Sequence, residues 1–101
     1  MEETLLLRRK EPRMPMKMFV NLHSLDIPNF EVAPTIDISC HGARVVTKTR
    51  WQPNQRLSVR SIRGNLSAHA RVAYCQPYKD NLFVIGIEMS YQTGDWTKPK
   101  R

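Results

Sequence analysis

The strongest structural signal in this sequence is the alternation of apolar and polar side chains along residues 66–74. Successive side chains of a β-strand point to opposite faces, so a period of two predicts a strand with one buried face. The side chains predicted to face the interior are Leu66, Ala68, Ala70, Val72 and Tyr74. This segment therefore predicts a strand that contributes one face to a hydrophobic core.

Five further segments read as strands and are separated by turn signals. They are residues 16–23, 30–39, 43–48, 56–60 and 82–90. Gly64-Asn65 predicts a two-residue hairpin turn, and Pro34 predicts a bulge or an edge position within its strand. Residues 82–90 are apolar on both faces, so another part of the chain should cover the outer side. Six short strands at this spacing predict an all-β sandwich or barrel, and no long amphipathic helix is visible.

Length and charge narrow the possible functions. A chain of 101 residues forms one domain, and 16 basic against 9 acidic residues give a net charge of +7. That charge favours an anionic partner such as a nucleotide, a nucleic acid or an anionic membrane surface. Cys40 and Cys75 make no disulfide framework, and no zinc-ligand spacing is present. No run is long enough to span a bilayer, and Leu5-Leu6-Leu7 is too short for a signal-peptide core, so we expect a soluble protein of a reducing compartment.

A basic segment near the N-terminus is a candidate ligand arm. Arg8, Arg9 and Arg13 lie within six residues, and Pro12 disfavours helical geometry at the residue before it. The segment is therefore predicted to be extended or turning, and able to wrap around an anion. Arginine suits that role because its planar fork binds a phosphate, or the O6/N7 edge of guanine, through two hydrogen bonds.

A polar turn between two predicted strands is the second candidate site. Asp37 and Ser39 are two residues apart and would point to the same face of a strand. A carboxylate there can accept hydrogen bonds from guanine N1–H and N2–H, and a hydroxyl can donate or accept. Gly42 allows positive φ or a close approach of the backbone to a ligand.

Together these two motifs resemble the PilZ domain family of bacterial cyclic di-GMP receptors. The motifs are Arg9-x-x-x-Arg13 and Asp37-x-Ser39-x-x-Gly42, and the similarity extends over residues 8–91. The resemblance implies a six-stranded antiparallel β-barrel with an N-terminal arginine arm. It divides the chain into a flexible arm (1–14), a barrel (15–91) and a basic C-terminal tail (92–101).

The resemblance also implies roles for individual residues. Arg9 and Arg13 would clamp phosphate and guanine, while Asp37 and Ser39 would read a guanine edge. Gly42 would let the backbone come close. An arginine at the position of Arg8 goes with binding a stacked pair of ligand molecules, which implies one or two cyclic di-GMP molecules per chain. The implied function is a non-enzymatic receptor in the bacterial cytoplasm that orders its arm and signals to an unknown downstream protein, with no cofactor other than this ligand.

The C-terminal end departs from the family pattern. The family usually adds a helix after its last strand, whereas Gly94, Pro99 and the basic end of this chain make a poor helix. We therefore expect the helix to be short or absent. Trp96 would plug the barrel opening in its place, or the chain is a fragment.

Two alternatives to the receptor remain open. A small basic barrel could bind single-stranded nucleic acid through Arg56, Arg60, Arg63 and Arg71, although the aromatic residues, 8% of the chain, do not interleave with these positions. Some PilZ-like domains bind no ligand and serve as protein-interaction modules, but those usually lack the arginine motif. An enzyme is disfavoured because no nucleophile with its base, no paired carboxylates and no metal spacing are present.

Overall fold

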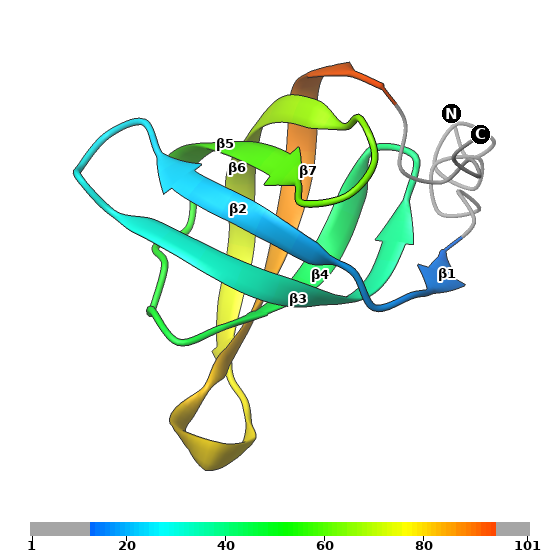
Figure 1. Ribbon diagram of the computed structural model, residues 1–101. Coiled ribbons are helices and arrows are strands. Elements are labelled where there is room, and N and C mark those ends of the chain that lie inside the picture. The colour runs from blue at the N-terminus through cyan, green and yellow to red at the C-terminus, as the bar shows by residue number, and fades with distance from the viewer. Residues whose placement is uncertain (1–12, 95–101) are drawn as a thin grey trace, which may run out of the picture.

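The computed structural model describes residues 13–94, which form seven strands and one short 3-10 helix (Figure 1). The elements are β1 (Met14–Pro15), β2 (Phe19–Ser24), β3 (Phe30–Ser39), β4 (Gly42–Thr47), β5 (Arg56–Ser61), β6 (Ser67–Pro77), η1 (Lys79–Asn81) and β7 (Phe83–Thr93). The predicted arm with Arg8 and Arg9, and the tail with Trp96, lie outside the described residues.

Six of the strands close into an antiparallel barrel. Hydrogen-bonded neighbours run in the order β3-β2-β5-β6-β7-β4, and β4 pairs again with β3, which completes the ring (Figure 1). The short β1 is an additional strand that pairs antiparallel with the last part of β3. Met14 lies opposite Ile38, and Pro15 lies opposite Asp37. The predicted all-β, six-stranded antiparallel barrel is confirmed, and residues 13–94 contain no α-helix.

The core fills the barrel from every strand of the ring. Inward positions recur with a period of two, and the fully buried side chains include Val20, Leu22, Val45, Leu57, Val59, Val72 and Ile85. The largest of the fully buried side chains is Trp51, which is 1% exposed although it lies in the connection between β4 and β5.

A single carboxylate holds the Trp51 connection against the barrel. Glu31 of β3 accepts hydrogen bonds from the backbone N–H groups of Lys48 and Thr49, the latter at 3.3 Å. The indole Nε1–H of Trp51 donates to the same carboxylate at 3.3 Å. Because the buried indole N–H has a partner, the ring can enter the core without the penalty of an unsatisfied donor.

The turn between β5 and β6 is longer than predicted. Ser61 ends β5 and Ser67 begins β6, and the Ser61 N–H donates to the Leu66 carbonyl at 3.2 Å. Gly64 has φ +95°, but Asn65 is not among the residues with positive φ. A two-residue turn of the type that favours glycine and asparagine needs positive φ at both central positions. β5 and β6 do form an antiparallel hairpin, but the predicted two-residue turn at Gly64-Asn65 is wrong, because a longer loop connects the two strands.

A register shift in β3 turns Asp37 to the outside of the barrel. Thr35 lies opposite Val45, and Asp37 lies opposite the next residue of β4, Arg44, so Ile36 is an extra residue in β3. Such a bulge interrupts the alternation of faces. Thr35 and Val45 are both buried, whereas Asp37 shares an outward position with the exposed Arg44. The bulge predicted from Pro34 thus occurs two residues after it, at Ile36 of the same strand.

A second register shift moves Tyr74 to the outer face. Val72 of β6 lies opposite Ile87 of β7, but Tyr74 lies opposite the adjacent Gly86, so Ala73 is the extra residue. Val72 and Ile87 are core residues. The next pair therefore faces outward, and the prediction that Tyr74 belongs to the inner set is wrong. The ring of Tyr74 lies against Gly86, where an added Cβ would be 2.3 Å from the Tyr74 Cε2 atom. Tyr74 is thus one of the groups that cover the apolar β7.

Candidate functional site

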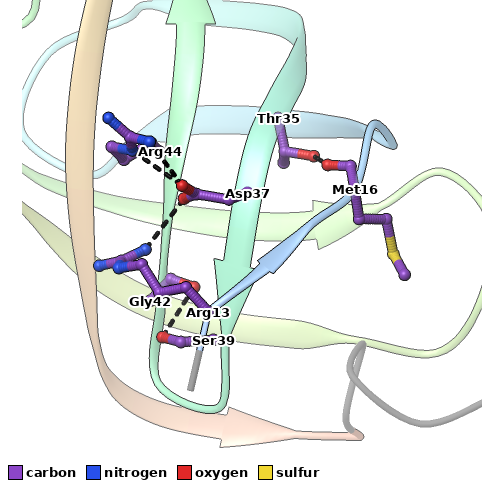
Figure 2. A network of polar contacts seen from close by, with 7 residues as sticks. All are labelled: Arg13, Met16, Thr35, Asp37, Ser39, Gly42 and Arg44. Carbon is purple, nitrogen blue, oxygen red and sulfur yellow. Dashed lines mark hydrogen bonds and ion pairs between the residues drawn. The ribbon is translucent and has the colours of Figure 1, made fainter. Parts of the chain in front are cut away.

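The centre of the candidate site is the carboxylate of Asp37, which lies between two arginines (Figure 2). Arg44 donates from Nε and Nη2 to Asp37 Oδ2, at 3.0 and 2.6 Å. Arg13 approaches from the other side, and its Nη1 donates to Asp37 Oδ1 at 3.0 Å. The Asp37 side chain is 9% exposed, whereas those of Arg13 and Arg44 are 49% and 44% exposed. The two guanidinium groups thus cover the carboxylate and leave their own surfaces open to solvent.

Strand β1 and its connection to β2 bring Arg13 to this position. β1 pairs with the end of β3 that carries Asp37, and Arg13 immediately precedes β1. Thr35 secures the connection because its hydroxyl donates to the Met16 carbonyl at 2.7 Å (Figure 2). The same hydroxyl accepts from the Met18 N–H at 3.0 Å. Arg13, the last arginine of the predicted arm, is therefore anchored on the barrel beside the predicted polar turn.

The two arginines control the charge of Asp37. Burial by itself would raise the pKa of this carboxyl, but the hydrogen bonds and positive charge of Arg44, together with those of Arg13, hold its pKa below the usual value. In return, the hydrogen bonds and charge of Asp37 raise the pKa of the Arg44 guanidinium. At neutral pH the cluster is therefore one carboxylate with two cations and carries a net positive charge.

The ion cluster should make the stability of the barrel depend on acidity. Because the folded-state pKa of Asp37 is lowered, its contribution is complete above the unfolded pKa of about 3.9 and is lost as pH falls through the folded value. We expect an Asp37→Asn variant to be less stable than the unaltered chain at pH 6, by at most about 1 kcal/mol because solvent screens the half-exposed arginines. Urea unfolding at pH 6 and pH 2.5 should show this difference narrowing at the lower pH. A difference that is the same at both would contradict the prediction.

Ser39 and Gly42 lie opposite each other at the end of the β3–β4 hairpin. The Ser39 hydroxyl donates to the Gly42 carbonyl at 3.4 Å. Gly42 has no positive φ, but a Cβ there would be 2.7 Å from the Ile87 carbonyl oxygen of β7. A side chain at this position would push β4 away from β7. The requirement for glycine here comes from the close approach of the two strands, rather than from the positive φ that the sequence had allowed.

The structure brings together four of the six predicted ligand-binding residues. Asp37, Ser39 and Gly42 lie on the paired strands β3 and β4, and Arg13 immediately precedes β1. Arg8 and Arg9 lie outside the described residues. The sequence did not reveal that Arg44 is the principal partner of Asp37. The spacing could have indicated it, because in a strand that begins at Gly42 the side chain of Arg44, two residues later, points to the same face.

The arginines considered for nucleic-acid binding are partly committed to ion pairs. Arg56 donates to Asp26 at 2.7 Å, and Arg71 donates to Glu88 at 2.6 Å and to Asn54 at 3.0 Å. Their charges are therefore neutralised in part by carboxylates on the same surface. This arrangement weakens the case for a continuous cationic track along β5 and β6.

Within residues 13–94, no group of three or more histidine, cysteine, aspartate or glutamate side chains is placed to hold a metal ion. The same residues include no helix with the length and apolar character needed to cross a membrane.

Comparison with known protein families gives a match over most of the chain. A family model described as PilZ domain matches residues 7–95, which include both sequence motifs and all the described strands. Neither the search of curated proteins nor the search of solved structures gave a significant match.

Proposed function

This chain belongs to the PilZ domain family, whose members are generally non-catalytic, cyclic di-GMP-binding domains, and we propose that it is itself a receptor for cyclic di-GMP. The observation that carries the proposal is the outward-facing carboxylate of Asp37 between Arg13 and Arg44. The Asp37 carboxylate could accept hydrogen bonds from the N–H groups of guanine, and the two guanidinium groups on the same surface could bind phosphate.

The ion cluster suggests how the ligand would enter. Arg13 occupies Asp37 Oδ1 through one hydrogen bond, whereas Arg44 holds Oδ2 through two. Guanine N1–H and N2–H would replace Arg13 at the carboxylate, because that contact is the weaker of the two. The released guanidinium would then donate to a ligand phosphate, which it can bind through two parallel hydrogen bonds. Arg44 would keep Asp37 ionised and correctly oriented throughout the exchange.

The arginine arm would supply the remaining contacts. Arg9 and Arg8 precede Arg13 closely enough in sequence to reach the same ligand, and Arg8 would support a second ligand molecule. Ordering the arm would cost roughly 1–2 kcal/mol for each backbone residue that becomes fixed. The arginine–phosphate contacts must offset this cost, so the affinity should fall as salt rises. The ordered arm would present a new surface to a downstream protein in the bacterial cytoplasm.

The proposal is tested by isothermal titration calorimetry with cyclic di-GMP at moderate salt. We expect an Arg13→Ala variant to bind at least about tenfold more weakly, because it loses a charged hydrogen-bonding partner of the phosphate. Arg56→Ala is the matched control, since Arg56 also pairs with an aspartate but lies elsewhere on the barrel. Cyclic di-AMP is the control ligand, because adenine lacks the N1–H and N2–H donors.

Two results would count against the receptor. One is the absence of binding to the unaltered chain, when circular dichroism shows that it is folded. The other is an Arg13→Ala variant whose affinity equals that of Arg56→Ala. A ratio close to two ligands for each chain would support the role given to Arg8.

A further inference from the structure

The outer face of the barrel carries a row of residues that extends from the candidate site across four strands. Asp37 of β3 lies opposite Arg44 of β4, Arg44 lies opposite Gly86 of β7, and Gly86 lies opposite Tyr74 of β6. These four residues, which we call the outer row, occupy successive positions along the hydrogen-bonding direction of the sheet. The predicted motifs cover only the first of them.

Both ends of the outer row face outward because of bulges. The extra residue in β3 brings Asp37 to the outer face, and the extra residue in β6 does the same for Tyr74. Bulges often redirect a side chain beside a functional site. Here two separate bulges direct a carboxylate and an aromatic ring to the same face, on either side of Arg44 and Gly86.

Gly86 lets the Tyr74 ring lie on the backbone of β7. A Cβ at Gly86 would come within 2.3, 2.6 and 2.9 Å of the Tyr74 atoms Cε2, Cζ and Cδ2, so the ring occupies the space that a side chain would fill. Tyr74 remains partly exposed, and no other ring or cation of residues 13–94 stacks on it. One side of the ring is therefore supported by the barrel, and the residue stays accessible from solvent.

The length of the outer row fits a ligand with two bases. Neighbouring strands are about 4.8 Å apart, so three strand spacings separate Asp37 from Tyr74 by about 14 Å along the sheet. One base cannot contact both ends of this row. A cyclic dinucleotide carries two bases joined through two phosphates, and Arg44 lies between the two ends, where the phosphates would pass.

We propose that Tyr74 is a stacking platform for a second purine base of the bound ligand, in addition to the base read by Asp37. This inference rests on the proposed cyclic di-GMP function and extends the binding site from β3 and β4 to β6. Aromatic rings bind bases through their π-faces, and a ring already held against Gly86 loses little freedom when a base stacks on it. The second base would belong to the same ligand molecule or to a stacked partner molecule.

The first test measures cyclic di-GMP affinity by calorimetry for the unaltered chain, Tyr74→Leu and Tyr74→Phe. We expect Tyr74→Leu to bind roughly tenfold more weakly, within the range that loss of one stacked base produces, and Tyr74→Phe to stay within about twofold. Tyr91→Leu is the matched control, because Tyr91 is an exposed tyrosine of β7 that lies opposite His69, away from the outer row. Thermal melting should show that all three variants are folded.

A second test detects stacking directly and does not depend on a loss of affinity. Tyr74→Trp places an indole on Gly86, and saturating cyclic di-GMP should quench its emission beyond any change seen in the unaltered chain. Equal emission changes in both proteins, or a Tyr74→Leu variant that binds like Tyr91→Leu, would overturn the stacking role while leaving the receptor function intact. If the unaltered chain binds no cyclic di-GMP, the proposed function fails and this inference fails with it.

Discussion

A Trp51→Ala variant is expected to lose about 3–5 kcal/mol of the free energy of unfolding, which is the usual effect of removing a buried tryptophan. Trp51 is the largest of the fully buried side chains and is 1% exposed. Its removal would leave a large cavity in the barrel and would also leave Glu31 with one hydrogen bond fewer. Domains of this size are stable by only about 5–15 kcal/mol, so the variant should be partly unfolded at 37 °C or close to it.

Denaturant unfolding of three proteins separates the contributions to this loss. Trp51→Phe keeps an aromatic ring but lacks the N–H donor, so it should lose less stability than Trp51→Ala. Tyr91→Ala is the matched control, because Tyr91 is an aromatic residue that is 63% exposed. If Trp51→Ala unfolds at the same urea concentration as the unaltered chain, the position of Trp51 in the core is wrong.

An Asp37→Ala variant is expected to lose at least about a hundredfold in affinity for cyclic di-GMP. In the proposed complex the Asp37 carboxylate accepts two N–H groups of guanine, and hydrogen bonds to a charged group contribute about 1.5–3 kcal/mol each. The variant keeps Arg13 and Arg44, which lose their shared carboxylate and can still attract phosphates. It should therefore bind cyclic di-GMP and cyclic di-AMP with similar, weak affinity.

The distinctive result of the Asp37 experiment is thus the loss of discrimination between guanine and adenine. Asp26→Ala is the matched control, since Asp26 also pairs with an arginine, Arg56, at 2.7 Å on another part of the surface. It should leave both the affinity and the preference unchanged. An Asp37→Ala variant that still prefers cyclic di-GMP would show that another group reads the guanine edge.

Much of the fold could be predicted because the barrel strands are locally amphipathic. Residues 30–39 were predicted as a strand with the bounds that β3 has, and the other five barrel strands differ from their predicted segments at one or both ends. The loop after Ser61 was missed because asparagine beside glycine favours a tight turn only when both residues adopt positive φ. That choice depends on how β5 and β6 pair, and the two turn residues alone do not decide it.

The candidate site was predicted less completely than the fold. Arg13, Asp37, Ser39 and Gly42 were recognised because they form spaced motifs of suitable chemistry, and the structure places them together. Arg44 was not identified as the partner of Asp37. The two are seven residues apart, and their contact exists because β3 and β4 form a hairpin with a bulge in it.

The sequence by itself determined which segments become strands, which side chains supply charge and hydrogen bonds, and the family to which the chain belongs. These properties follow from local alternation and from short motifs. Only the tertiary structure decided that Asp37 and Tyr74 face outward in one row and that Trp51 enters the core. The physical reason is that the alternation of faces is a property of one strand, whereas a bulge exists only in the pairing of two. A single extra residue between paired strands changes the face of every side chain that follows it.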